Sequence, residues 1–110
     1  MKRTLIVDDN FQNLYLLETL LAGSGYEVIS ARNGMEAFDL AKNDPPDIII
    51  SDILMPVMDG FELCRKCKEH DILKQVPFIF YTATYTEPKD EQFALSLGAE
   101  KFLVKPQVPE

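Results

Sequence analysis

Short apolar segments of this sequence end in side chains that could carry out phosphate or metal chemistry. They are Asp8-Asp9, Asp52, Thr82 and Lys105. Clustered carboxylates repel one another unless a cation neutralises them. All the candidate ligands are oxygens, which favours Mg²⁺ or, as an alternative, Mn²⁺. Such a site suits phosphoryl transfer, with one carboxylate as the nucleophile and the lysine and hydroxyl contacting the phosphoryl oxygens.

The apolar segments alternate with longer amphipathic segments, which is the pattern of a parallel sheet covered by helices on both faces. The predicted strands are residues 4–7, 27–30, 48–50, 77–81 and 102–104. One predicted helix follows the N-cap Asn10 and ends at Gly23 and Gly25; the others span about 35–42, 61–69 and 89–97. The sequence therefore predicts a doubly wound α/β fold with five strands and four helices.

The third predicted strand places an acid at the centre of this sheet. Ile48-Ile49-Ile50 is continuously apolar and β-branched, which is typical of a strand buried on both faces, and Asp52 follows it closely. In an open parallel sheet, ligands bind beyond the carboxyl ends of the strands. We therefore expect the candidate residues to converge on one edge. Each acid alone could be a solvated loop residue or a helix N-cap, but the repeated position favours a site.

The bulk properties limit the choice of partner and location. The formal net charge is -7 and the pI is about 4.6, which argues against binding nucleic acid or an anionic membrane. The 110 residues suit one domain, which we place at residues 1–110. Because no apolar run is long enough to span a bilayer and no signal peptide is recognisable, we expect a cytoplasmic protein.

The two cysteines and the single histidine are expected to be structural. Cys64 and Cys67 lie three residues apart in a predicted helix, with no second Cys or His pair to complete a zinc site. We predict small, partly buried side chains there, with redox chemistry as a weaker alternative. His70 follows that helix in a polar stretch, far from the strand ends, and is expected at the surface.

In combination, four motifs resemble the signature of response-regulator receiver domains of two-component signalling systems. They are Asp8-Asp9, the run Asp52-Ile53-Leu54-Met55-Pro56-Val57-Met58-Asp59-Gly60, Thr82-Ala83, and Phe102-Leu103-Val104-Lys105-Pro106. Each motif lies at the corresponding element and in the same order as in the family. The resemblance implies the flavodoxin-like, or CheY-like, strand order 2-1-3-4-5.

The resemblance also implies a role for each site residue. Asp52 would accept the phosphoryl group. Asp9, Asp52 and the backbone carbonyl of Leu54 would hold Mg²⁺, while Asp8 would act mainly through metal-bound water. Lys105 would contact the phosphoryl group, and the Lys105-Pro106 bond would be cis, as is usual in the family.

Thr82 and Phe102 resemble the switch pair of the family. There the hydroxyl moves toward the new phosphate and the aromatic ring turns inward to fill the vacated space. Because Phe102 lacks a tyrosine hydroxyl, we expect it to be buried more of the time even before phosphorylation. Ordinary core packing of Phe102 is an equal alternative.

The resemblance names a sensor histidine kinase or a phosphotransfer protein as the partner. The domain would catalyse only its own phosphorylation and dephosphorylation, so we do not expect a turnover enzyme. A homodimer and a covalent output domain beyond Glu110 are both open options.

The last residues, Gln107-Val108-Pro109-Glu110, are too few for the closing helix of the fold, so we expect a fragment that lacks its fifth helix.

Two rival functions share parts of the pattern. A flavodoxin-like FMN carrier needs backbone N–H donors in the loop after the first strand, and Asp8-Asp9 would repel the phosphate of FMN there. An aspartate-nucleophile phosphatase normally has two acids at Asp-x-Asp spacing after one strand. Here Leu54 stands two positions after Asp52, which disfavours that reaction.

Overall fold

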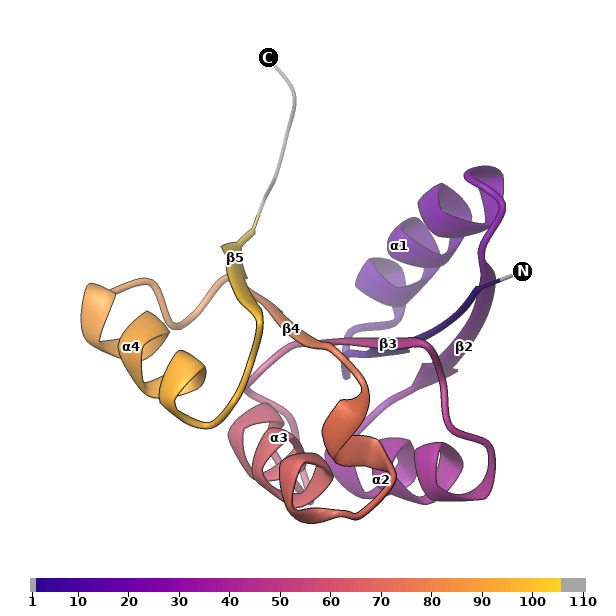
Figure 1. Cartoon of the computed structure of the whole chain (residues 1–110). Coiled ribbons are helices and arrows are strands. Elements are labelled where there is room, and N and C mark those ends of the chain that lie inside the picture. Colours follow the sequence, from indigo (N-terminus) through magenta and orange to yellow (C-terminus); the bar gives the residue numbers. More distant parts are fainter. Residues whose placement is uncertain (1, 106–110) are drawn as a thin grey trace.

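The computed structural model describes residues 2–105, and in this part the chain forms a parallel sheet in the order β2-β1-β3-β4-β5 (Figure 1). The strands are β1 (Arg3–Val7), β2 (Glu27–Ala31), β3 (Ile48–Ser51), β4 (Phe78–Thr82) and β5 (Lys101–Val104). Every neighbouring pair is parallel. The predicted α/β fold and its strand order are confirmed, and the strand bounds differ from the predicted ones by at most one residue.

Helices cover both faces of the sheet. In the described part they are α1 (Phe11–Gly23), α2 (Gly34–Asn43), α3 (Gly60–Glu69), the short 3₁₀ helix η1 (Leu73–Gln75) and α4 (Pro88–Ser96). Figure 1 shows α1 on one face and α2 and α3 on the other. The four predicted α-helices are confirmed, whereas η1 was not predicted. The expected cis bond to Pro106 and the expected lack of a closing helix concern residues outside those described.

Side-chain caps fix where the helices begin. Asn10 accepts a hydrogen bond from the N–H of Asn13, which confirms the predicted cap of α1. Asn33 and Asp59 cap α2 and α3 in the same way, and a capping box begins α4.

None of the helices within residues 2–105 is long and apolar enough to cross a membrane.

The main hydrophobic core lies between the sheet and α2 and α3. The strands contribute side chains that are almost completely buried: Leu5, Val7, Ile49, Phe78 and Phe80. From α3, Leu63, Cys64 and Cys67 pack against this layer. Because side chains alternate along a strand, the neighbouring residues Ile6, Ile50, Ile79 and Tyr81 lie on the face that carries α1.

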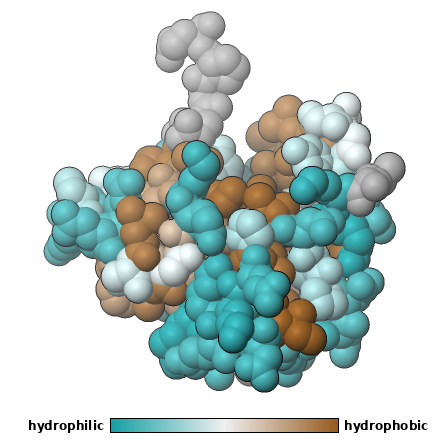
Figure 2. All heavy atoms as spheres, in the orientation of Figure 1, coloured by the Kyte–Doolittle hydropathy of each residue, from teal (hydrophilic) through white to brown (hydrophobic). Residues whose placement is uncertain are grey.

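The α1 face is less covered over β4 and β5 in the described part of the chain. A groove of about 270 Å³ lies there, lined by Leu17, Leu20, Ile50, Ile79, Tyr81 and Leu103. Leu16 and Leu20 on α1 are each 64% exposed. Figure 2 shows brown, apolar surface over α1 at the upper right. An uncovered face of a parallel sheet is unusual, since such sheets are normally covered on both sides.

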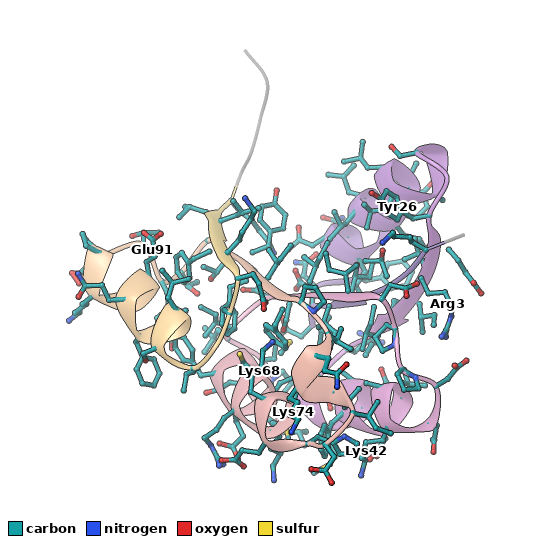
Figure 3. The ribbon with its side chains drawn as sticks, in the orientation of Figure 1. Arg3, Tyr26, Lys42, Lys68, Lys74 and Glu91 are labelled. Carbon is teal, nitrogen blue, oxygen red and sulfur yellow. The ribbon has the colours of Figure 1, made fainter. Side chains whose placement is uncertain are left out.

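A lysine on α3 contacts the edge of the sheet where β4 and β5 begin. The ammonium of Lys68 donates to the carbonyl of Val76 at 3.0 Å and contacts Glu100 Oε1 at 3.3 Å. Glu100 Oε2 in turn accepts from the N–H of Phe78 at 2.6 Å. In Figure 3, Lys68 lies between α3 and the segment that leads into β4. This contact fixes α3 against the amino ends of both strands.

Cys64 and Cys67 pack in the core, and His70 makes hydrogen bonds that hold the next turn. Both thiols are buried, with exposures of 0% and 1%, which is more complete than the predicted partial burial. His70 is half-buried rather than simply at the surface. Its Nδ1 accepts from the N–H groups of Ile72 and Leu73, so the imidazole caps the turn that begins η1.

The burial of the two thiols predicts how stability changes at alkaline pH. Burial raises the pKa of Cys64 and of Cys67 from 9.0 to about 12. The stabilisation is complete below pH 9 and is lost as the pH rises toward 12, because only the unfolded chain releases the protons. The free energy of unfolding should fall by up to about 1.4 kcal/mol per pH unit for each thiol in this window.

Urea unfolding at several pH values above 8 measures this slope. The double variant Cys64→Ala, Cys67→Ala should be less stable at every pH because of the cavities, yet lose less stability as the pH rises. Other groups that titrate in this range are common to both proteins and cancel in the comparison. Parallel curves for the two proteins would contradict the assignment.

Candidate functional site

Strand register brings the predicted site residues side by side. Val7 on β1 is the partner of Ser51 on β3, and Thr82 on β4 is the partner of Val104 on β5. Asp8, Asp52 and Lys105 each follow directly after one of these paired positions. The predicted convergence on the carboxyl edge of the sheet is therefore confirmed for these residues.

The ammonium of Lys105 lies between two carboxylates. Its Nζ is 2.6 Å from Asp8 Oδ2 and 3.2 Å from Asp52 Oδ2. The side chains are largely buried, with exposures of 12% for Lys105, 9% for Asp8 and 14% for Asp52. Hydrogen bonds between charged groups in such surroundings are stronger than neutral ones. We call these three residues the ion triad.

The charge of Lys105 depends on its two partners. Burial by itself lowers the pKa of the lysine, but the hydrogen bond that the ammonium donates to Asp8 and the charges of Asp52 and Asp8 outweigh it and raise the pKa above 10.5. The ammonium is therefore protonated at neutral pH. Its positive charge balances part of the negative charge at this edge of the sheet.

Backbone contacts hold the carboxylates in place. Asp8 Oδ1 accepts from the N–H of Asn10 at 2.9 Å, and Asp52 Oδ1 accepts from the N–H of Ile53 at 2.7 Å. The N–H of Asp52 donates to the carbonyl of Val7 at 2.8 Å, which continues the β1–β3 pairing by one residue. Each carboxylate thus has one oxygen fixed by the backbone and the other directed at Lys105.

A pocket of about 330 Å³ opens at the ion triad and runs along α1. Its polar end contains the three charged side chains, and its apolar end contains Leu14, Leu17, Leu20 and Tyr81. Asp9 and Leu54, the other two predicted metal ligands, are both exposed, and Leu54 has an exposure of 58%. Within residues 2–105, no group of three or more His, Cys, Asp or Glu residues is arranged to hold a metal ion.

The comparison with protein families shows to which family this fold belongs. Residues 4–110 match the model of the response regulator receiver domain. The chain belongs to this family. It is a receiver domain of the kind found in response regulators and in signal transduction histidine kinases, and its role in phosphorelay signalling follows from that membership.

Individual relatives agree with this assignment. The chain is 40% identical over 105 residues to the polar-differentiation response regulator DivK of Brucella anthropi, covering 96% of this chain and 85% of DivK. It superposes on the chemotaxis response regulator CheY4 of Vibrio cholerae with a TM-score of 0.90 at 37% identity, over 96% of this chain and 88% of CheY4.

A third relative is the receiver domain of the sensor histidine kinase PA1611 from Pseudomonas aeruginosa PAO1. It has a TM-score of 0.86 at 30% identity, over 96% of this chain and 85% of that domain. Its structure is described with a magnesium ion coordinated in the active site cleft. Magnesium is thus a ligand that receiver domains bind in their active site.

In this receiver domain the predicted switch residues lie on neighbouring strands. Thr82 is completely buried, and its Oγ1 accepts from the N–H of Thr84 and lies 3.3 Å from Thr84 Oγ1. The ring of Phe102 is half-buried and its centroid is 6.3 Å from that of Phe80. Sequence reasoning missed Thr84, because only the turn after β4 brings its hydroxyl back to Thr82.

Sequence reasoning gave no role to Gly60, although the recognised motif ends in it, and it missed Tyr81. A Cβ on Gly60 would lie 2.1 Å from the backbone carbonyl oxygen of Asp52, so only glycine fits at the start of α3. The ring of Tyr81 lies with its centroid 5.2 Å from Lys105 Nζ. The glycine was visible in the Asp59-Gly60 motif, whereas the tyrosine contact had no signal in the sequence.

The close approach of Gly60 to Asp52 predicts the effect of a single methyl group. Gly60→Ala should lower the free energy of unfolding by about 2 kcal/mol or more, because the added atom must displace backbone. Gly23→Ala is the matched control, since a Cβ at Gly23 meets nothing within 4 Å. It should leave stability unchanged or raise it, because alanine favours a helix over glycine.

Urea unfolding of the two variants and the wild type measures the difference. Equal stability of Gly60→Ala and Gly23→Ala would show that the β3–α3 loop can yield, and that Gly60 does not constrain the position of Asp52.

Proposed function

We propose that Asp52 is the phosphoryl acceptor of this receiver domain. The observation that carries the proposal is the ion triad, in which the carboxylate of Asp52 faces Lys105 at 3.2 Å while the backbone fixes its other oxygen. The side chain is 14% exposed at the mouth of a pocket, so a donor can approach it. A nucleophile that is held in place avoids much of the entropic cost of reaching the reactive geometry.

Asp8 is less suited to the same role. It makes the shorter contact with Lys105, at 2.6 Å, and its other oxygen accepts from the N–H of Asn10. Its side chain is also less exposed than that of Asp52. We therefore assign Asp8 to cation binding and Asp52 to the transfer itself.

In the proposed transfer, an oxygen of Asp52 forms a bond to phosphorus while the bond from phosphorus to the donor nitrogen or oxygen breaks. The leaving group of the donor takes the electron pair of that bond. Lys105 supplies a positive charge beside the transferring oxygens, and the hydroxyl of Thr82 or Thr84 can donate to one of them. The same residues would serve hydrolysis of the acyl phosphate, so the domain acts only on its own phosphorylation state.

The donor set fits Mg²⁺, with Mn²⁺ as the alternative. Oxygens of Asp8 and Asp52 both lie within hydrogen-bond distance of a single cation, the ammonium of Lys105. With Asp9 and the carbonyl of Leu54 they would form an oxygen-only ligand set of the kind that Mg²⁺ prefers. When bound, the ion would neutralise the carboxylates so that an anionic donor can approach.

Thr82 and Phe102 are proposed as the switch pair. Thr82 is buried with its hydroxyl close to Thr84, and a new phosphate on Asp52 would offer a charged acceptor instead. The ring of Phe102 is half-buried and packs against the core. Movement of Thr82 would allow the ring to pack more deeply.

The proposed partner is a sensor histidine kinase or a phosphotransfer protein, in the cytoplasm. One relative of this chain is the receiver domain of a histidine kinase, which supports that partner class. The net charge of -7 again disfavours direct contact with nucleic acid or an anionic membrane. The family match over residues 4–110 supports one receiver unit within the chain.

Labelling with a small phosphodonor tests the acceptor directly. Incubation with phosphoramidate and Mg²⁺ should add the mass of one phosphoryl group to the wild type, and Asp52→Asn should gain none, because an amide is not a nucleophile. Asp59→Asn is the matched control: Asp59 caps α3, and asparagine caps helices equally well, so this variant should be labelled like the wild type.

Intact-protein mass spectrometry gives the readout, and fragmentation locates the label. Labelling of Asp52→Asn to the same extent as the wild type would contradict the assignment, as would a label found on Asp8 in the wild type.

A further inference from the structure

We propose that Tyr81 is a positioning residue for Lys105: the face of its ring holds the ammonium in the site when the carboxylates of the ion triad bind a metal ion. This inference deepens the proposed function and rests on it, since it assigns a residue that keeps Lys105 ready for the phosphoryl group. The juxtaposition that carries it is the 5.2 Å distance from Lys105 Nζ to the ring centroid of Tyr81.

The backbone explains why this ring and this ammonium meet. Tyr81 precedes Thr82 on β4, and the N–H of Lys105 donates to the carbonyl of Thr82 at 2.7 Å. Lys105 is therefore tied to β4 by its backbone, directly beside Tyr81. Because side chains alternate along a strand, Tyr81 and Thr82 point to opposite faces, and the ring lies on the face that carries α1.

The strength of the contact follows from its surroundings. A cation within about 6 Å of the centroid of an aromatic ring is attracted by the negative face of the ring, and the attraction grows as water is removed. The Lys105 side chain is only 12% exposed, and Tyr81 is half-buried. The ring also lines the pocket that opens at the ion triad.

A positioning ring is needed because lysine is a flexible residue. Its ammonium is a compact charge on a stem of four carbons, with no fixed geometry of its own. In the described structure Asp8 and Asp52 hold it, yet the same oxygens would become ligands of the metal ion. Their attraction for the ammonium would then fall, while the attraction of the ring would not change.

The simpler explanation is that Tyr81 only covers the apolar groove. It lines that groove together with Leu103, its register partner on β5. The two explanations differ in what a substitution does: a groove residue needs bulk, whereas a positioning residue needs an aromatic face. Tyr81→Phe keeps both, Tyr81→Leu keeps bulk without the face, and Leu103→Ala removes bulk from the same groove.

Phosphorylation kinetics with phosphoramidate and Mg²⁺ separate the two explanations. The rate for Tyr81→Leu should fall by about fivefold, within the range expected for loss of one desolvated cation–π contact, at unchanged Mg²⁺ affinity. Tyr81→Phe should restore the rate to within about twofold of the wild type, and Leu103→Ala should match the wild type. A similar fall in Leu103→Ala, or no rescue by phenylalanine, would overturn the proposal.

A second readout does not depend on phosphorylation. Acylation of Lys105 by a small reagent in the presence of Mg²⁺, measured by peptide mass spectrometry, should be about severalfold faster in Tyr81→Leu than in the wild type or Tyr81→Phe, because the ammonium is no longer held. Equal acylation in all of them would overturn the proposal. If the three proteins differ in acylation as expected but the wild type accepts no phosphoryl group, the assignment of Asp52 as acceptor fails. The positioning role of Tyr81 then stands.

A measurement on the wild type alone tests the proposal even if a variant fails to fold. The Nζ atom of Lys105 lies over the ring of Tyr81, so the NMR signals of the adjacent ε-methylene protons in the Mg²⁺-loaded protein should be shifted upfield of those of exposed lysines such as Lys89. Signals at the position of the exposed lysines would overturn the proposal.

Discussion

The contact of one ammonium with two buried carboxylates is the constraint on which the functional edge of this domain depends. Asp8 and Asp52 are each tied to the backbone of their own strand end, so neither can move away from the other. Two buried carboxylates without a nearby cation would be costly. Lys105 supplies that cation from the end of β5, and the contact therefore links the carboxyl ends of β1, β3 and β5.

The opposite edge of the sheet is organised by a different lysine. Lys68 and Glu100 fix α3 to the amino ends of β4 and β5, and their contacts are with backbone groups as well as with each other. Between the two edges lies a core of buried apolar side chains. These contacts do not involve the carboxyl edge, so a change of charge there leaves them in place, which is what a phosphorylation switch requires.

The fold was predictable because its determinants are local. Alternation of apolar and amphipathic segments indicated every strand, and caps such as Asn10 marked where helices begin. Asp8, Asp52 and Lys105 were predictable because a strand end is visible in the sequence. The contact of Tyr81 was not predictable, because it depends on which face of β4 lies beside Lys105. Asp9 lies exposed because the strand pairing turns Asp8 inward.

At this site Lys105 and a divalent cation would compete for the same carboxylates. A calorimetric titration of Mg²⁺ into the wild type and Lys105→Ala tests it most directly, with Lys89→Ala as a control because the side chain of Lys89 is 79% exposed and far from the acids in sequence. Lys105→Ala should bind Mg²⁺ more tightly than the wild type, and Lys89→Ala should bind it equally. Weaker binding by Lys105→Ala, or no binding by any of the three proteins, would show that the lysine and the metal ion do not compete.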